Sequence, residues 1–167
     1  MVLDYDADLA FAAGRCERSD LVTVPVVTEH LVLLSSEQNS APASAKELES
    51  ETLLVFPEGC AYRRQLENWL HAEGVVAENV IVFDSLPAIL ASVCAGLGVA
   101  LLPENAAAKH LKSSRIAARE IPQPYGSLPL NLAYRSDQYP SPALHELIEL
   151  VTSGIAYRST IPRGRMV

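Results

Sequence analysis

The pattern of apolar and polar residues changes twice between Glu78 and Asn105, from a continuous apolar run to helical spacing and back to an apolar run. In the middle of this segment apolar residues recur at helical spacing, at Leu86, Ile89, Leu90, Val93, Cys94 and Leu97. This spacing predicts a helix with one continuous apolar stripe, which must pack against another surface. Residues 80–83 and 99–102 flank the helix as short apolar runs, which predict buried strands. A right-handed parallel strand–helix–strand crossover fits this order best.

The ends of these elements are marked by residues with defined conformational preferences. Ser85 suits the N-cap of the helix, and Pro87 suits its first turn. Gly96 and Gly98 bracket the point where helical periodicity stops, and Pro103 ends the second apolar run. The segment therefore predicts an α/β unit with well-defined turns.

More elements are predicted on both sides of this unit. A second strand, turn and helix run from Thr52 to Gly74, because Tyr62, Leu66 and Trp69 share one helical face. The polar residues 35–45 predict an exposed loop. The other expected elements are strands over residues 8–13, 21–27, 30–34, 115–121 and 128–135, a short helix over 103–111, and a last helix capped by Ser141.

Composition indicates a soluble globular chain with one ordinary core. The chain has 167 residues, of which 49% are hydrophobic and 20% are charged. No apolar run reaches the roughly 18 to 20 residues that a membrane span needs, and the amino terminus is acidic, unlike a secretory signal. We therefore expect a cytoplasmic protein without membrane contact.

The balance of charge argues against direct DNA binding by this chain. Twenty acidic residues against 13 basic ones give a formal charge of −7, which would repel a phosphate backbone. The basic residues near the carboxyl end, Arg158, Arg163 and Arg165, fit a solvated tail.

Residue spacing offers little support for catalysis, a cofactor or a metal. The cysteines Cys16, Cys60 and Cys94 are far apart and odd in number, and none of the four histidines has metal-binding or catalytic spacing. No phosphate-binding loop or nucleophile elbow occurs, and Gly96 and Gly98 follow a helix instead of opening one. We therefore expect no enzyme, no cofactor and no metal site.

Two predicted helix starts are the best candidates for a binding site. The first comprises Gly59, Cys60, Ala61 and Tyr62, and the second Asp84 and Ser85. The first turn of a helix carries unpaired N–H groups and a partial positive charge, so a carboxylate or phosphate can bind there. The alternative is that Asp84 and Ser85 only cap their helix and Gly59 only turns the chain.

Cys60 has a second possible role as a thiol redox sensor. It lies in the first turn of a helix and is followed by Arg63 and Arg64, which would favour the thiolate. The alternative is a small side chain that lines a pocket or the core, since free cysteine is among the most commonly buried residues.

Five segments in order resemble one protein family. They are YDADLAFAAG, LVTVPVVTEHLVLLSS, LLVFPEGCAYRRQLENWLHAEG, FDSLPAILASVCAGLGVALLPENAA and LPLNLAYRSDQYPSPALHELIELV. At these spacings they resemble the effector-binding domain of LysR-type transcriptional regulators. The resemblance implies an α/β chain with the two-lobed fold of type 2 periplasmic binding proteins.

The resemblance implies a complete second lobe and a partial first lobe. The first lobe would hold residues 1–23 and the return segment 127–160, the second lobe residues 24–126, and a tail residues 161–167. The family's DNA-binding domain and the beginning of its first lobe would lie upstream of this chain. A first lobe without its partners should expose apolar surface.

The family's effector site lies between the lobes, and matching its motifs adds Gly14 and Arg15 to the helix starts named above. Arg15 would pair with an effector carboxylate, or with Glu29 when the site is empty. The expected function is to sense a small, anionic effector and change the geometry of a homo-oligomer, a dimer or tetramer, on DNA. The alternatives are a free-standing solute-binding protein or enzyme of the same fold, and a thiol sensor.

Overall fold

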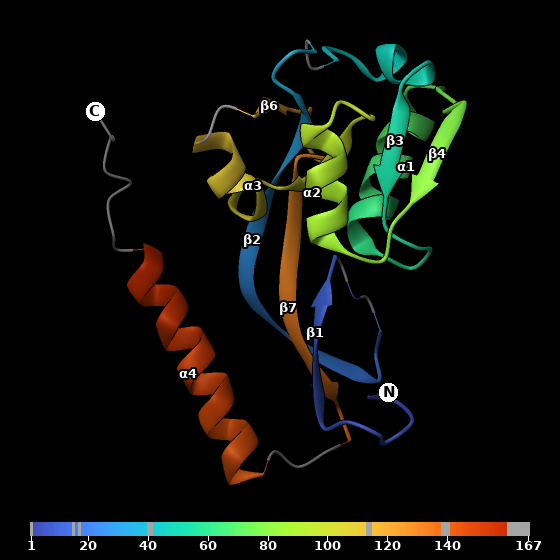
Figure 1. Ribbon diagram of the computed structural model, residues 1–167. Coiled ribbons are helices and arrows are strands. Elements are labelled where there is room, and N and C mark those ends of the chain that lie inside the picture. The colour runs from blue at the N-terminus through green and yellow to red at the C-terminus, as the bar shows by residue number, and fades with distance from the viewer. Residues whose placement is uncertain are drawn as a thin grey trace. The chain divides into compact units, whose positions relative to one another are not determined.

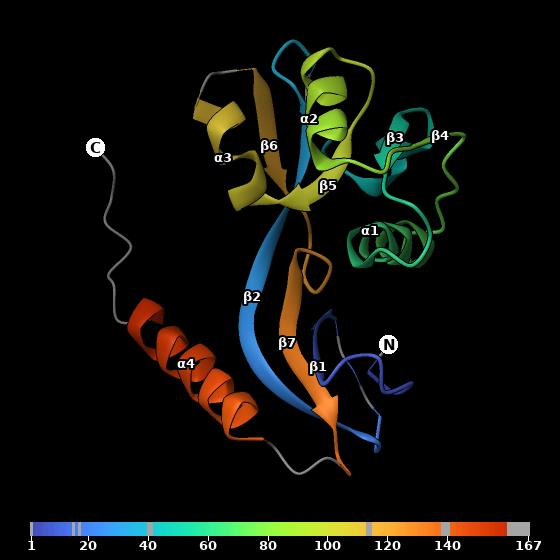
Figure 2. The ribbon, with the colours of Figure 1, turned by 60° about the horizontal axis from the view of Figure 1, so that its bottom comes forward.

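The computed structural model describes residues 2–14, 16, 18–39, 42–112, 115–137 and 141–159, the last six by their backbone only. Figure 1 and Figure 2 show the arrangement of helices and strands within each part of the chain. The strands are β1 (Leu9–Ala13), β2 (Leu21–Ser36), β3 (Thr52–Val55), β4 (Asn79–Val82), β5 (Ala100–Pro103), β6 (Ile116–Glu120) and β7 (Ser127–Arg135). The helices are α1 (Ala61–Ala72), α2 (Leu86–Cys94), α3 (Glu104–Lys112) and α4 (Pro142–Ser159), with a 3-10 helix at Ala45–Glu49.

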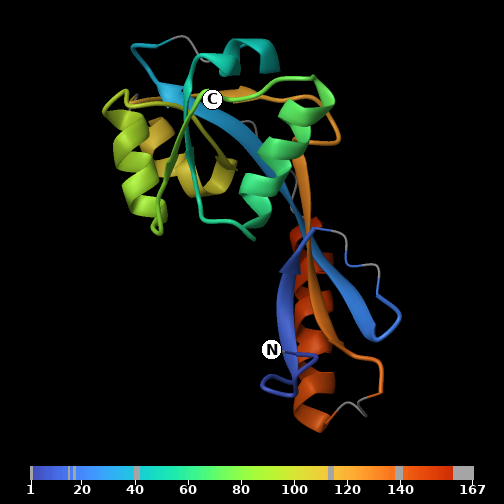
Figure 3. The same ribbon diagram turned by 90° about the vertical axis from the view of Figure 1, so that its right-hand side faces the viewer.

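The chain divides into two compact units. Unit 1 contains Met1–Thr28 and Pro129–Val167, and unit 2 is the continuous segment Glu29–Leu128. The chain passes between them twice, once inside β2 and once inside β7, which are the two long strands in Figure 3.

Unit 2 is organised around the second half of β2, where four apolar residues in a row, 31–34, are buried. This half of β2 pairs antiparallel with β5 and with β6. Helices α2 and α3 contribute their apolar faces to the same core. The core cluster contains Val32, Leu34, Leu54, Ile89, Leu90, Val93, Ala100, Leu102, Ala107 and Ile116. Burial of these side chains supplies the main driving force for folding of the unit.

The predicted parallel crossover is present with another strand in its middle. β4 pairs parallel with β3, and after α2 the chain returns to the opposite side of β3, where Val99 forms a parallel bridge with Leu53. Beyond this bridge, β5 pairs antiparallel with β2. Gly98 lets the chain approach β3 closely, since a Cβ atom at this position would lie 2.1 Å from the carbonyl oxygen of Thr52.

Several details of the sequence interpretation are wrong. The strands expected over residues 21–27 and 30–34 are one continuous strand, β2. Leu97 is not part of the buried stripe, because α2 ends at Cys94, Gly96 adopts a φ of +76°, and Leu97 is 49% exposed. β4 is not a buried strand, since every residue in it is exposed. Ser35 and Ser36 are not in an exposed loop, because β2 continues through them and both are buried.

Unit 1 is built on an antiparallel pair of β1 and β7, with Leu9 opposite Tyr134 and Ala13 opposite Leu130. Phe11 on β1 is 56% exposed, and several other apolar residues of this unit are exposed as well. As predicted, α4 begins with Ser141 as a cap, whose hydroxyl accepts a hydrogen bond from the N–H of Leu144 at 3.2 Å. In the part of the chain that is described, no helix is both long and apolar enough to cross a membrane.

Candidate ligand-binding site

The two helix starts predicted as a binding site follow neighbouring strands. β3 and β4 are parallel, and their last residues, Val55 and Val82, lie opposite each other. The N–H of Phe83 donates to the carbonyl oxygen of Val55 at 2.9 Å, which continues the pairing past both strands. Because parallel strands end at the same edge, α1 and α2 both begin from this edge of the pair. The structure therefore brings the two helix starts to one side of unit 2.

The start of α1 presents unpaired backbone donors. Gly59 has a φ of +91° and turns the chain into the helix, with open space where a side chain would stand. Cys60 is the N-cap, and its side chain makes no capping hydrogen bond. Among the described residues, no acceptor bonds the N–H groups of Ala61, Tyr62 and Arg63. These donors and the positive end of the helix favour an anion at this position.

The start of α2 has the same property with a different sequence. Ser85 occupies the predicted N-cap position, but its hydroxyl makes no capping hydrogen bond, so the alternative in which this side chain satisfies the helix start is wrong. Asp84 and Ser85 are both exposed. Within the described chain, the N–H groups of Leu86 and Ala88 have no bonded acceptor. Both helix starts therefore retain donors for a ligand.

Tyr62 makes a side-chain contact that the sequence did not predict. Its hydroxyl donates to the Oε2 atom of Glu29 at 2.9 Å, and both residues are partly buried. Its ring lies 6.3 Å from the ring of Phe56, centroid to centroid. Burial, and then the hydrogen bond to Glu29, raise the pKa of Tyr62 to about 12. Tyr62 is therefore a neutral hydrogen-bond donor at physiological pH.

The two arginines after Cys60 differ in their pairing. The Nε atom of Arg63 donates to Glu67 at 2.7 Å, and its Nη1 atom donates to the carbonyl oxygen of Phe56 at 3.4 Å. Arg64 is exposed and makes no ion pair among the described residues. Both arginines line a groove of about 300 Å³ beside Gly59 and Cys60, together with the carboxylates of Glu58 and Glu67, both of which pair with Arg63. Arg64 is thus the cation next to the α1 start that is available to a ligand.

The positions predicted in unit 1 are only partly described. Gly14 follows β1 with a φ of +93°, and its N–H donates to the carbonyl oxygen of Pro129 at 2.8 Å. Its own carbonyl oxygen accepts a hydrogen bond from Nδ2 of Asn131 at 3.0 Å. Arg15 lies outside the described residues. Its expected pairing with Glu29 therefore stays a prediction, and Glu29 accepts the hydrogen bond from Tyr62.

The thiols of Cys60 and Cys94 lie at different places in unit 2, and only Cys60 lies at one of the two helix starts. Cys60 is a free, half-buried thiol. In unit 2, the Sγ atom of Cys94 lies 3.7 Å from Nδ1 of His110. No group of three or more potential metal ligands occurs within the described part of the chain.

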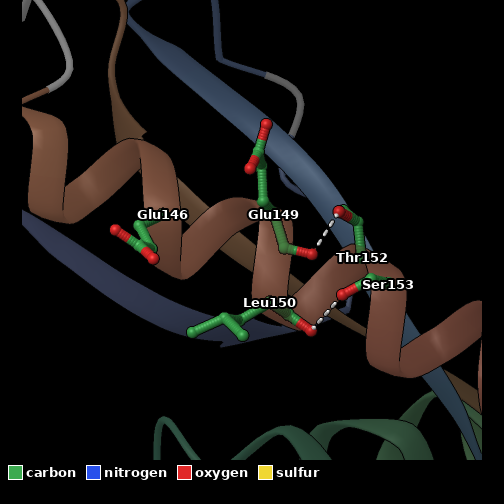
Figure 4. A pocket seen from close by; sticks show the side chains of 5 residues that line it. All are labelled: Glu146, Glu149, Leu150, Thr152 and Ser153. Atoms are coloured by element: carbon green, nitrogen blue, oxygen red, sulfur yellow. Dashed lines mark hydrogen bonds between the residues drawn. The ribbon is translucent and has the colours of Figure 1, made fainter.

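Another surface depression lies away from the helix starts, on α4. It has a volume of about 530 Å³ and is lined by Glu146, Glu149, Leu150, Thr152 and Ser153. In Figure 4 the hydroxyls of Thr152 and Ser153 point back to carbonyl oxygens of the same helix, at 3.1 Å in each case. Two carboxylates and two internally bonded hydroxyls offer nothing that would hold an anion. We therefore place the candidate site at the helix starts.

The sequence matches a known family over nearly its whole length. The family model described as "LysR substrate binding domain" matches residues 1–156. HTH-type transcriptional regulator GltR of Bacillus subtilis is 36% identical over 143 residues, which cover 86% of this chain and 48% of that protein. HTH-type transcriptional regulator YofA of Bacillus velezensis is 35% identical over 164 residues, which cover 98% of this chain and 54% of that protein. The chain thus spans about half the length of these relatives.

Solved structures of regulatory domains share the fold at low sequence identity. The regulatory domain of NMB2055 (MetR), a LysR family regulator from N. meningitidis, has a TM-score of 0.80 and 17% identity, covering 96% of this chain and 76% of that one. The effector-binding domain of QuiR in complex with shikimate has a TM-score of 0.77 and 15% identity, with 93% and 75% covered. The BenM effector-binding domain with its effector benzoate has a TM-score of 0.73 and 16% identity, with 99% and 77% covered.

Proposed function

Because this chain belongs to the LysR substrate-binding domain family, we propose that it binds a small anionic metabolite through the starts of α1 and α2. Binding would change the arrangement of the two units and so report the metabolite to the rest of the regulator. The observation that carries this proposal is the pair of unsatisfied helix starts at one edge of β3 and β4.

The chemistry of the site supports an anion. A carboxylate can accept hydrogen bonds from the N–H groups of Ala61 and Tyr62 without a dedicated cation, and Arg64 adds a positive charge nearby. Shikimate and benzoate, bound by two proteins of the same fold, are both carboxylates. Arg15 and Gly14 of unit 1 are proposed to contribute to the same ligand.

Self-association and DNA binding complete the proposal. We propose that the chain acts in a cytoplasmic homo-oligomer and that DNA is contacted through a domain outside it, which the net charge of −7 supports. In unit 2, β4 exposes three consecutive apolar residues, Val80, Ile81 and Val82, along a strand that pairs with β3 on one side. Such an edge favours pairing with a second copy.

A titration followed by NMR tests the binding proposal. Benzoate, shikimate and other small carboxylates are added to the ¹⁵N-labelled chain, and the N–H resonances of Ala61, Tyr62, Leu86 and Ala88 are followed. We expect saturable shifts at both helix starts for at least one carboxylate. Shifts confined to other parts of the chain, or none for any carboxylate, would refute an anion site here.

A pair of glycine variants sharpens this test. Gly59→Ala places a methyl group beside the α1 start, and Gly74→Ala makes the equivalent change beyond the other end of the helix. Both glycines have positive φ, +91° and +68°, and both have open space where a Cβ would stand, so both variants strain the backbone without a steric clash. We expect Gly59→Ala to weaken carboxylate binding about tenfold, a change of about 1.4 kcal/mol, and Gly74→Ala to leave it unchanged.

A further inference from the structure

Helix α1 is hydrogen-bonded to both places where the chain enters or leaves unit 2. The hydroxyl of Tyr62 donates to Glu29, which is the first residue of the unit. The Nε2 atom of Gln65 donates to the carbonyl oxygens of Pro124 and Ser127, each at 3.1 Å. Ser127 precedes Leu128, the last residue of the unit. One helix therefore contacts the incoming and the outgoing segment.

The two donors occupy one face of α1. Tyr62 and Gln65 are three residues apart, so their side chains project from adjacent turns on the same side of the helix. Leu66 and Trp69 continue on this side and are buried, with 1% and 2% of their surfaces exposed. Packing therefore fixes the helix within unit 2. Its two polar side chains also bind the two passages, which are the segments where the chain enters the unit at Glu29 and leaves it at residues 124–128.

The passages are also bonded to each other. The N–H of Leu31 in β2 donates to the carbonyl oxygen of Gly126 at 2.9 Å. Gly126 lies between Pro124 and Ser127, the two residues that Gln65 contacts. Displacement of α1 would therefore act on two segments that are already connected.

We propose that Tyr62 and Gln65 are positioning residues that couple the start of α1 to both passages and so set the arrangement of the two units. The inference rests on the proposed function for the location of the ligand. A ligand at the first turn of α1 acts on the helix that is hydrogen-bonded to Glu29 and Ser127. A change in the position of α1 is therefore transmitted to the chain at both ends of unit 2. The high pKa of Tyr62 keeps its hydroxyl protonated, and therefore able to donate, across the physiological range.

Conservative variants test this coupling in the whole chain. Tyr62→Phe removes one hydroxyl, and Gln65→Met removes the amide while keeping the length of the side chain. Asn68→Met is the matched control, because Asn68 is an exposed residue of the same helix without a hydrogen bond among the described residues. Circular dichroism and NMR spectra of each variant establish that both units remain folded.

Residual dipolar couplings then measure whether units 1 and 2 share one alignment tensor, that is, whether their relative orientation is fixed. We expect the alignment tensors of units 1 and 2 to diverge in the double variant Tyr62→Phe/Gln65→Met, while couplings within unit 2 still fit one tensor. We also expect hydrogen exchange at the N–H of Leu31 to accelerate about tenfold or more, because the double variant loses the hydrogen bond to the Glu29 carboxylate and the contacts of the Gln65 amide. Asn68→Met should behave like the wild type.

Unchanged inter-unit alignment in the double variant would overturn the proposal, as would an equal change in Asn68→Met. This result is separable from failure of the binding site. If no carboxylate shifts the resonances of Ala61, the binding proposal fails, and the alignment of the ligand-free variants still decides the coupling. If shikimate or benzoate shifts Ala61 but changes the inter-unit alignment equally in wild type and double variant, the coupling fails and the site stands.

Discussion

β4 and β5 are strands of the same length with similar apolar sequences and opposite environments. β4 is Asn-Val-Ile-Val and is exposed at every residue, whereas β5 is Ala-Leu-Leu-Pro and is buried at every residue. β5 pairs with β2 and is covered by α1 and α3, while β4 pairs with β3 alone among the described strands. Burial of a short apolar strand is thus decided by its place in the sheet and not by its composition. An apolar strand left exposed is a surface available to a partner.

The largest expected effect is on stability, from shortening a side chain of β5. Leu102 is 1% exposed and belongs to the core cluster, so Leu102→Ala should lower the free energy of unfolding by about 2–5 kcal/mol. Ile81→Ala in β4, which is 37% exposed, should lower it by about 1 kcal/mol or less. Urea titrations of both variants measure the two values. Equal losses would show that β4 is as well packed as β5.

The next effect concerns self-association, and here β4 should be the sensitive strand. Val80→Lys/Val82→Lys places two positive charges on an edge that we propose pairs with a second copy, so the dissociation constant should rise about tenfold or more, with little change in stability. Sedimentation velocity over a concentration series measures it. The control is Leu97→Lys, since Leu97 is 49% exposed in the turn after α2. Equal weakening by the control would remove β4 from the interface.

The smallest effect depends on pH and involves Tyr62, which contacts the same small space as Leu101 and Leu102 of β5. Its pKa in the folded chain is raised to about 12 from an ordinary value of about 10. A raised pKa means that the neutral form is favoured by folding, so this contribution is complete below about pH 10 and is lost as the pH rises towards 12. Urea midpoints of wild type and Tyr62→Phe should therefore converge across this window. A constant difference would show that the hydroxyl does not titrate as described.

The helices and most strand positions follow from local patterns, because periodicity and end signals lie within each segment. The stripe from Leu86 to Val93 and the Ser141 cap correctly located α2 and α4. The environment of β4 could not be predicted in this way, since it depends on which strands stand beside it. Leu97 fits the helical spacing, but Gly96 ends the helix before it.

The helix starts of the candidate site were recognisable from sequence, but their surroundings were not. Gly59 and Ser85 carry local turn and capping signals, and the parallel pairing of β3 with β4 brings them to one edge. The contact from Tyr62 to Glu29 spans 33 residues, and the contact from Gln65 to Ser127 spans 62. Nothing in the local sequence marks either partner, because the polar residues meet only after the strands have assembled. Hydrogen bonding at the passages therefore required the structure.

The bond between Leu31 and Gly126 has a practical consequence. Unit 2 is one uninterrupted stretch of chain inserted between the two segments of unit 1, and backbone pairing joins its two ends. Such a module can be exchanged between homologous regulators by two cuts at neighbouring points, without rerouting the polypeptide. Chimeras built at these junctions would combine unit 2 of one relative with unit 1 of another.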